Sequence, residues 1–185
     1  MAISSRLKAL LEAQHVKYTA QSHPTVYTAQ EIAAAQHVPG RQLAKCVLVK
    51  TEKGVTLAVL PAIYRVDVKK VKALVKAKTL RLASEAEIKQ AFPDVEVGAM
   101  SPFGNLYNIP VVADKSLAEA EEIVCNAGSH TETITLRYRD FERLAHPRQG
   151  GFAQGVGGAK PKKKQAARRP SKKSRKPATR KARRR

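Results

Sequence analysis

The stretch QLAKCVLVK, residues 42–50, decides how the fold is interpreted, because it has the composition of a buried β-strand. Side chains in a strand alternate between two faces, so Lys45 shares a face with Val47 and Val49. Lys50 lies at the end of the stretch, where its charge can reach water. Lys45 lies at the beginning, on a face that is otherwise apolar. Such a lysine either extends along the strand end to solvent or holds an anionic ligand.

The sequence around this strand predicts helices and strands that do not alternate regularly. Apolar spacing and capping residues predict helices at 4–14, 28–36, 67–77, 84–92 and 138–146. Apolar runs predict two strands within 43–62, joined around 52–54, and further strands at 109–114, 121–128 and 131–138. An irregular mixture of this kind favours an α+β fold over a doubly wound parallel sheet.

Charge divides the chain into two parts. The full 185 residues carry a formal charge of +20, but residues 160–185 contain fifteen Lys or Arg and no Asp or Glu. The preceding residues have a formal charge of only +5. We therefore predict a folded domain at 1–148, followed at 149–185 by a glycine-containing hinge and a disordered Lys/Arg-rich tail.

Several functional classes receive no support from the sequence. No run of eighteen apolar residues is present, and the N-terminus lacks a signal-peptide core, so we expect a cytoplasmic protein without membrane contact. Cys46 and Cys125 are predicted to be reduced core residues. The nucleophile elbow, the phosphate-binding loops and metal-ligand spacing are all missing, and we expect no metal or cofactor.

Three stretches are candidates for a site. Besides Lys45, the segment VGAMSPFGNLYNIP contains a Gly/Pro-rich turn at 98–102, which could present backbone N–H groups to a ligand or be a simple connection. The segment NAGSHTETI places His130 before a strand, after small residues that allow close approach to the backbone. The alternative for this third stretch is a hairpin turn with a surface histidine.

Together, Lys45 in LAKCVLV, GAMSP at 98–102 and GSH at 128–130 resemble the YbaK/prolyl-tRNA synthetase-associated editing domain family. The resemblance runs from about residue 5 to His146. It implies hydrolysis, in trans, of the ester that joins a wrong small amino acid (Ala, Cys, Ser or Thr) to the terminal adenosine of a tRNA. It also implies a compact mixed sheet, partly barrel-like, with surrounding helices. The expected partners are mischarged tRNA and, in some members, an aminoacyl-tRNA synthetase.

The resemblance and the residues together predict roles in the site. The predicted catalytic set is Lys45, Gly98, Ala99, Met100, Ser101 and Pro102. Lys45 would hold the phosphate or ribose of the adenosine, and the turn would donate backbone N–H groups to the oxyanion. The predicted walls of the amino-acid pocket are Tyr27, Leu43, Cys46, Gly128, Ser129 and His130. A Cys46 nucleophile is an alternative, although strand alternation directs that side chain away from the face of Lys45.

The basic tail is predicted to bind nucleic acid electrostatically, without sequence preference. The candidate contacts are Lys162, Lys163, Lys164, Arg168, Arg169, Lys172 and Lys173. An alternative function is therefore a non-enzymatic nucleic-acid-binding protein in which the tail carries the activity.

Overall fold

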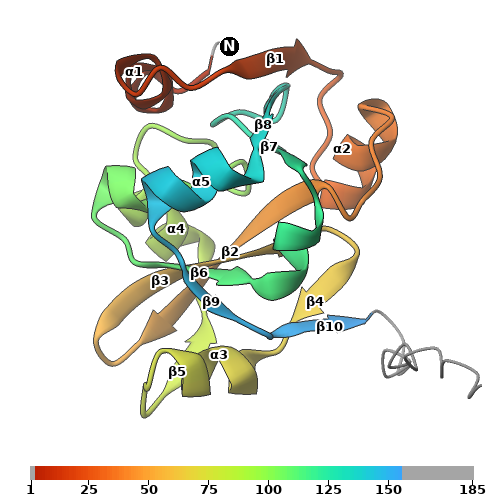
Figure 1. Ribbon diagram of the computed structural model, residues 1–185. Coiled ribbons are helices and arrows are strands. Elements are labelled where there is room, and N and C mark those ends of the chain that lie inside the picture. The colour runs from red at the N-terminus through yellow and green to blue at the C-terminus, as the bar shows by residue number, and fades with distance from the viewer. Residues whose placement is uncertain (1–2, 156–185) are drawn as a thin grey trace, which may run out of the picture.

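The computed structural model describes residues 3–155 (Figure 1). The helices are α1 (Ser5–Ala13), α2 (Ala29–Ala35), α3 (Val68–Leu74), α4 (Glu85–Ala91), η1 (Gly104–Tyr107), η2 (Lys115–Glu119) and α5 (Tyr138–Ala145). The strands are β1 (Tyr18–Ser22), β2 (Leu43–Thr51), β3 (Gly54–Pro61), β4 (Tyr64–Val66), β5 (Leu80–Leu82), β6 (Val111–Asp114), β7 (Glu122–Asn126), β8 (Glu132–Arg137), β9 (Arg148–Gly150) and β10 (Ala153–Gly155). None of the described helices is long and apolar enough to cross a membrane.

The main sheet is mixed, with strand order β1-β8-β7-β2-β3-β6-β9, and β5 also pairs with β2. The pairs β2–β7, β3–β6 and β6–β9 are parallel, whereas β2–β3, β2–β5, β7–β8 and β1–β8 are antiparallel. Strands β4 and β10 form a separate two-stranded sheet. The predicted α+β class is confirmed, and the helices are arranged around the sheet (Figure 1).

The alternation predicted for residues 42–50 is found in β2. Ala44 and Leu48 belong to the largest apolar cluster, which also contains residues of α1 and α5. Val49 belongs to a second cluster with Val71 of α3, and Leu43 belongs to a third cluster with residues of α2. The two faces of β2 are thus covered by different helices, and Lys45 lies on the side of α2 and α3.

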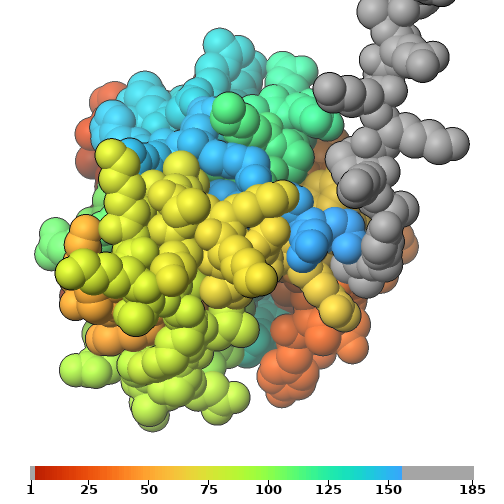
Figure 2. All heavy atoms as spheres, turned by 90° about the horizontal axis from the view of Figure 1, so that it is seen from below, coloured from red at the N-terminus to blue at the C-terminus, as the bar shows by residue number. Residues whose placement is uncertain are grey.

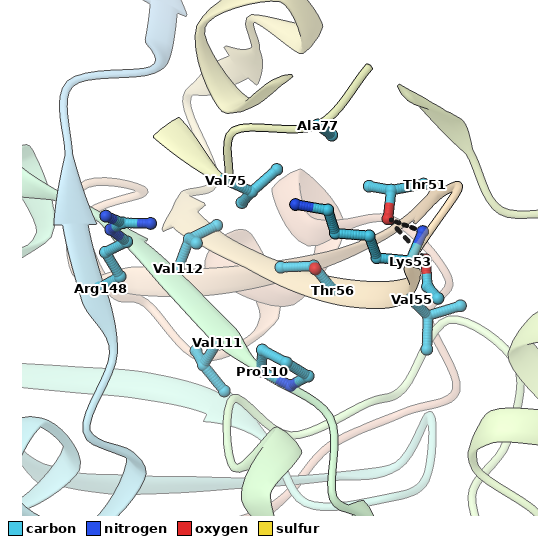
Figure 3. Close-up of a pocket in the computed structure, with 11 residues that line it drawn as sticks. Thr51, Lys53, Val55, Thr56, Val75, Ala77, Pro110, Val111, Val112 and Arg148 are labelled. Atoms are coloured by element: carbon cyan, nitrogen blue, oxygen red, sulfur yellow. Dashed lines mark hydrogen bonds between the residues drawn. The ribbon is translucent and has the colours of Figure 1, made fainter. Parts of the chain in front are cut away.

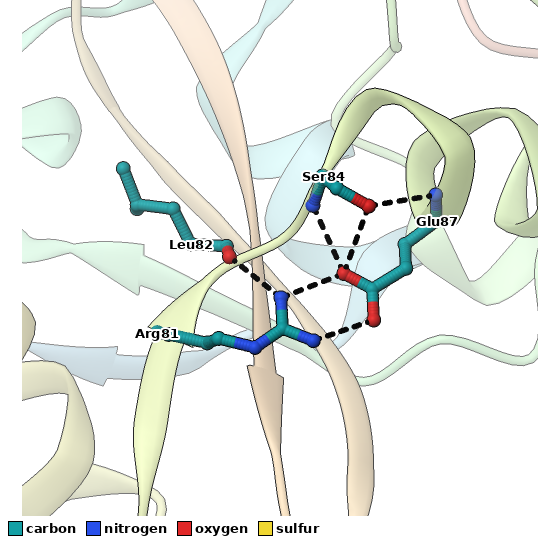
Figure 4. A network of polar contacts seen from close by, with 4 residues as sticks. All are labelled: Arg81, Leu82, Ser84 and Glu87. Carbon is teal, nitrogen blue, oxygen red and sulfur yellow. Dashed lines mark hydrogen bonds and ion pairs between the residues drawn. The ribbon is translucent and has the colours of Figure 1, made fainter.

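Side-chain caps define the starts of α2, α3, α4 and η2. The capping boxes predicted from Thr28–Glu31 and Ser84–Glu87 are both present. Glu87 also accepts two hydrogen bonds of 2.8 Å from the guanidinium of Arg81, which joins β5 to the start of α4 (Figure 4). The hydrogen bonds from Arg81, followed by that from the backbone N–H of the N-cap Ser84, lower the pKa of Glu87 to about 2.

The C-terminal boundary of the domain differs from the prediction. Residues 149–155 were expected to form a hinge, but β9 pairs with β6 and β10 pairs with β4. Phe152 between them is 1% exposed. The buried carboxylate of Asp114 accepts hydrogen bonds from the backbone N–H groups of Phe152 (2.5 Å) and Ala153 (2.6 Å). One aromatic residue and one buried carboxylate therefore fix a segment whose glycine-rich composition suggested a linker. The remainder of the predicted hinge and tail, residues 156–185, lies outside the described residues.

Candidate active site

The two turns predicted as site elements lie side by side. The backbone N–H of Glu96 donates to the carbonyl of Gly128 (3.0 Å), and the N–H of Gly128 donates to the carbonyl of Ala99 (3.2 Å). The side chain of Asn126 adds a hydrogen bond of 3.4 Å to the carbonyl of Gly98. These three contacts join the segment before β6 to the turn between β7 and β8, although the two are separated by about thirty residues in the sequence.

His130 is held at the junction of these turns. Its ring Nε2 lies 2.9 Å from the carbonyl of Val97, and its backbone N–H donates to Glu96 Oε2 at 2.7 Å. Gly98 has φ +95°, and a Cβ built on it would lie 3.3 Å from Cε1 of His130. Gly98 is therefore required both for its backbone conformation and for the close approach of the imidazole.

Tyr27 also contacts His130. The two ring centroids are 4.9 Å apart, and the N–H of Val26 donates to the carbonyl of His130 at 3.3 Å. Although Tyr27 is 71% exposed, its backbone precedes Thr28, the N-cap of α2. The structure thus brings together three of the predicted elements: the Gly98 turn, the 128–130 turn and Tyr27.

The backbone N–H groups of the Gly98 turn are not equivalent. That of Ala99 donates to the carbonyl of Glu96 at 2.9 Å and is not available to a ligand. Within the described residues, no acceptor is found for those of Gly98, Met100 and Ser101. Pro102 has no N–H. The turn can therefore offer up to three backbone N–H donors to a ligand, whereas the sequence alone allows four.

Lys45 is half-buried at the start of β2. Its Nζ donates to the carbonyl of Ala62 at 3.2 Å, and the same carbonyl accepts from Gln30 of α2 at 3.4 Å. Burial, with a smaller contribution from the nearby charge of Arg65, lowers the pKa of the Lys45 ammonium. Among the described residues no hydrogen bond joins Lys45 to the Gly98 turn or to His130. These parts of the site are connected through α2, which contains Gln30 and whose N-cap residue, Thr28, follows Tyr27.

Leu43 and Cys46 do not form open walls of a pocket. Leu43 is 2% exposed and packs against α2. The side chain of Cys46 packs against the main core, on the face of β2 opposite Lys45, and burial raises the pKa of its thiol. The pKa of Cys125 is raised for the same reason, and both thiols are free. A thiolate nucleophile at Cys46 is unfavourable in this environment.

The backbone of Cys46 has an unusual position in the sheet. The carbonyl of Leu43 accepts from Ala62 on the β3 side, whereas that of Leu48 accepts from Ala83 on the opposite side. Because these directions alternate along a strand, the N–H and C=O of Cys46 point away from β3. On that side β7 pairs with β2 only at residues 43–44, and β5 only at residues 49–51. Within the described sheet, Cys46 therefore presents an unpaired peptide edge next to Lys45.

A cavity of about 240 Å³ adjoins the 128–130 turn. Its lining residues are Ser4, Pro93, Asp94, Val95, Glu96, Gly128 and Ser129. Sequence analysis missed Glu96, which orients His130, and Gln30 and Arg65, which surround Lys45. These three are ordinary surface residue types in the sequence, so only tertiary contacts identify them.

A second cavity, of about 250 Å³, lies under the β2–β3 hairpin, between Lys53 and Arg148 (Figure 3). None of the predicted site residues lines it, and its floor is formed by Val55, Val75, Pro110, Val111 and Val112. The described residues contain no group of three His, Cys, Asp or Glu side chains placed to hold a metal ion. The predicted nucleic-acid contacts Lys162, Lys163, Lys164, Arg168, Arg169, Lys172 and Lys173 lie outside the described residues.

Comparison with solved structures supports the fold. A candidate trans-editing enzyme for prolyl tRNA synthetase superposes with a TM-score of 0.71 at 23% identity, over 82% of this chain and 97% of the other. The hypothetical protein APE2540 superposes with a TM-score of 0.75 at 19% identity, over 81% of this chain and 100% of the other. At these identities the likeness concerns the fold.

Sequence relatives and the family model extend this result. The Multifunctional Ser/Thr-tRNA deacylase ProXp-y of Escherichia coli (strain K12) is 29% identical over 152 residues, 80% of this chain and 90% of the relative. The proline–tRNA ligase of Geobacillus sp. (strain WCH70) is 30% identical over 104 residues, 56% of this chain but only 18% of the ligase. The model of the aminoacyl-tRNA editing domain matches residues 23–144. This chain therefore belongs to the aminoacyl-tRNA editing domain family and is an aminoacyl-tRNA deacylase, which hydrolyses mischarged aminoacyl-tRNA.

Proposed function

We propose that this deacylase acts in trans on tRNA that carries a small wrong amino acid (Ala, Cys, Ser or Thr), at the junction of the Gly98 turn, the 128–130 turn and Tyr27. The observation that carries the proposal is this junction, since three segments that are distant in the sequence meet there. A synthetase discriminates poorly between near-isosteric amino acids, because one methylene or hydroxyl contributes only about 1–3 kcal/mol. A separate hydrolytic site corrects the resulting errors.

In this proposal the Gly98 turn stabilises the oxyanion. The carbonyl carbon of an aminoacyl ester is activated, so a water can attack it once negative charge on the oxygen is stabilised. The N–H groups of Gly98, Met100 and Ser101 are the candidate donors, and one such donor contributes on the order of 10²–10³ in rate. Following the family resemblance, the vicinal ribose hydroxyl assists the attacking water. Neither step requires a covalent nucleophile, which agrees with the raised pKa of the Cys46 thiol.

Lys45 is proposed to hold the 3′ end of the tRNA through the phosphate or ribose of the terminal adenosine. Its ammonium is only half-buried, and the one hydrogen bond that it makes within residues 3–155, to the carbonyl of Ala62, leaves further N–H donors for a ligand. The partial burial strengthens its interaction with a phosphate because water screens the charge less. Gly128, Ser129 and His130 then face the amino acid, together with Tyr27.

The proposal is tested by replacing Lys45 with alanine and incubating the protein with a panel of mischarged tRNAs. Lys50→Ala is the matched control, because Lys50 lies on the same strand, five residues away, and is half-buried like Lys45. We expect Lys45→Ala to lose at least 10²-fold in single-turnover rate, with an unchanged circular dichroism spectrum. Lys50→Ala should retain the wild-type rate. Equal rates for wild type and Lys45→Ala would remove Lys45 from the site.

Three further features are proposed on composition and relatives alone. The tail residues Lys162–Lys164, Arg168, Arg169, Lys172 and Lys173 would raise the local concentration of tRNA without contacting the ester. The likeness to proline–tRNA ligases suggests that a synthetase is a partner. The cytoplasm, where tRNA is charged, is the proposed location.

A further inference from the structure

The positive charge of the domain is concentrated in one part of the chain. Residues 41–81 contain eleven Lys or Arg and two Asp or Glu, a formal charge of +9. The rest of the described chain contains nine Lys or Arg and thirteen Asp or Glu, a formal charge of −4. The excess positive charge of the described domain therefore comes from residues 41–81, and the rest of the domain is net negative.

Much of this positive charge lies on one surface, over β4, α3 and the turn between α3 and β5. We define the basic face by its exposed side chains Arg65, Lys69, Lys72, Lys76 and Lys78. Figure 2 shows this surface toward the viewer, with β4 and α3 in yellow and the turn to β5 in yellow-green. The side chains that bury α3 instead, Val71 above all, point into the second apolar cluster.

The side chains of the basic face form no ion pair within the described domain, although the carboxylates of Asp67 and Glu52 accept hydrogen bonds from the backbone N–H groups of Lys69 and Lys78. Lys70 pairs with Asp67, and Arg81 pairs with Glu87, so these two neighbours are excluded from the face. No ion pair is formed among the described residues by any of the five side chains that define it. The face also lacks large exposed apolar side chains, since the described residues have only Tyr27 and Leu82 of that kind. Such a surface suits a partner that supplies several phosphates.

The basic face continues from the candidate site. Lys45 lies on the side of β2 that is covered by α2 and α3, and its neighbour Val47 packs in the same cluster as Val71 of α3. Arg65, on β4, is close enough to Lys45 to help lower the pKa of its ammonium. From Arg65 the chain leads through Asp67 directly into α3. A ligand that reaches Lys45 with one end can therefore extend over the basic face.

We propose that the basic face binds the sugar-phosphate backbone of the tRNA acceptor stem while the 3′ end lies at Lys45. This inference rests on the proposed function, because it takes aminoacyl-tRNA as the ligand of the site. The contacts are with phosphates, so the face contributes affinity and orientation and leaves the choice of amino acid to the pocket.

The test uses the full chain with the three substitutions Lys69→Gln, Lys72→Gln and Lys76→Gln. The control carries Lys17→Gln, Lys89→Gln and Lys115→Gln, which remove the same charge from exposed lysines outside residues 41–81. The affinity of each protein for an unacylated proline tRNA transcript is measured between 50 and 300 mM salt. If each lysine of the face contacts one phosphate, the negative slope of log K against log salt becomes shallower by about 2–3 in the triple variant. This corresponds to an affinity for tRNA roughly 100-fold weaker than that of the wild type at 0.15 M salt.

The control should keep the wild-type slope and the wild-type affinity for tRNA. The inference is overturned if the two triple variants bind alike, or if only affinity for duplex DNA is lost while affinity for tRNA is unchanged. Because binding is measured with unacylated tRNA, the result does not depend on catalysis. A wild-type protein that binds tRNA through this face but releases no amino acid from any tRNA would refute the proposed function alone.

Discussion

Replacing Gly98 with alanine would show whether the conformation of its turn determines the rate of deacylation. Gly98 has φ +95°, and its Cα faces the ring of His130. Gly54, in the β2–β3 hairpin, provides a matched control, because its φ is +127° and a Cβ built there would meet nothing within 4 Å. Gly98→Ala and Gly54→Ala both impose backbone strain, but only Gly98→Ala places a new atom against His130.

The expected magnitudes follow from these two environments. A non-glycine residue in such a backbone region costs on the order of 1–3 kcal/mol, so both variants should lose similar stability. In a domain of this size that loss lowers Tm by about 2–4 °C for each kcal/mol. At Gly98 the new methyl would also lie 3.3 Å from Cε1 of His130, tighter than ordinary contact. If the turn relaxes by rotating its peptide groups, one oxyanion donor is lost, at a cost of about 10²–10³ in rate.

The assay is single-turnover hydrolysis of the mischarged tRNA that the wild-type protein deacylates best, at saturating protein and at a temperature well below both values of Tm. We expect Gly98→Ala to lower the rate constant at least 10²-fold with little change in the Kd for tRNA. Gly54→Ala should keep the wild-type rate constant despite a comparable fall in Tm. A rate constant for Gly98→Ala within twofold of that for Gly54→Ala would show that the turn is only a connection, and the proposed oxyanion role would be wrong.

Three other predictions concern the scaffold and the thiol. Phe152→Ala should lower the free energy of unfolding by about 3–5 kcal/mol in urea titrations, because it opens a cavity in the core, whereas the exposed Gln154→Ala on the same segment should change it little. Cys46→Ser should retain most of the deacylation rate, and the native Cys46 thiol should react slowly with a thiol reagent; complete inactivation by this single change would revive a thiolate mechanism. Glu52 and Glu87 both have pKa values lowered to about 2, from 4.5, by hydrogen bonds to backbone N–H groups and to Arg81. The contribution of these two carboxylates to the free energy of unfolding is therefore present above about pH 4.5 and is lost as the pH falls toward 2. The double variant Glu52→Gln, Glu87→Gln should lose less stability than the wild type over that pH range. Equal pH profiles of stability for the two proteins would contradict these pKa values.

Local signals in the sequence were sufficient for much of the fold. The apolar alternation of β2 and the capping boxes at Thr28 and Ser84 depend on residues a few positions apart, and each is confirmed. Strand β1 was missed because its sequence, YTAQS, is mostly polar and exposed, so burial leaves no pattern in it. Residues 149–155 were missed because their place depends on Asp114, more than thirty residues earlier.

The candidate site could likewise be predicted only in part from local signals. The sequence contains Lys45 and both turns, but their spacing does not show that Gly98 and His130 are in contact, and only the family resemblance suggested a common site. Glu96 could not be recognised, since its role is a hydrogen bond to a residue in another turn. Strand alternation correctly predicted that the side chain of Cys46 lies on the face opposite Lys45. The same alternation argued against the prediction that Cys46 lines the pocket.

The unpaired peptide edge of Cys46 has a consequence for hydrogen exchange. Lys45 and Val47 direct their N–H groups toward β3, within a ladder that runs the length of β2. The amide of Cys46 points to the side where neither β7 nor β5 pairs with it. In the protein without ligand, this amide should exchange with solvent faster than those of its two neighbours, although all three belong to the same strand. A substrate that binds this edge would reverse the order, so the exchange rate of one backbone proton would report occupancy of the site without any change in a side chain.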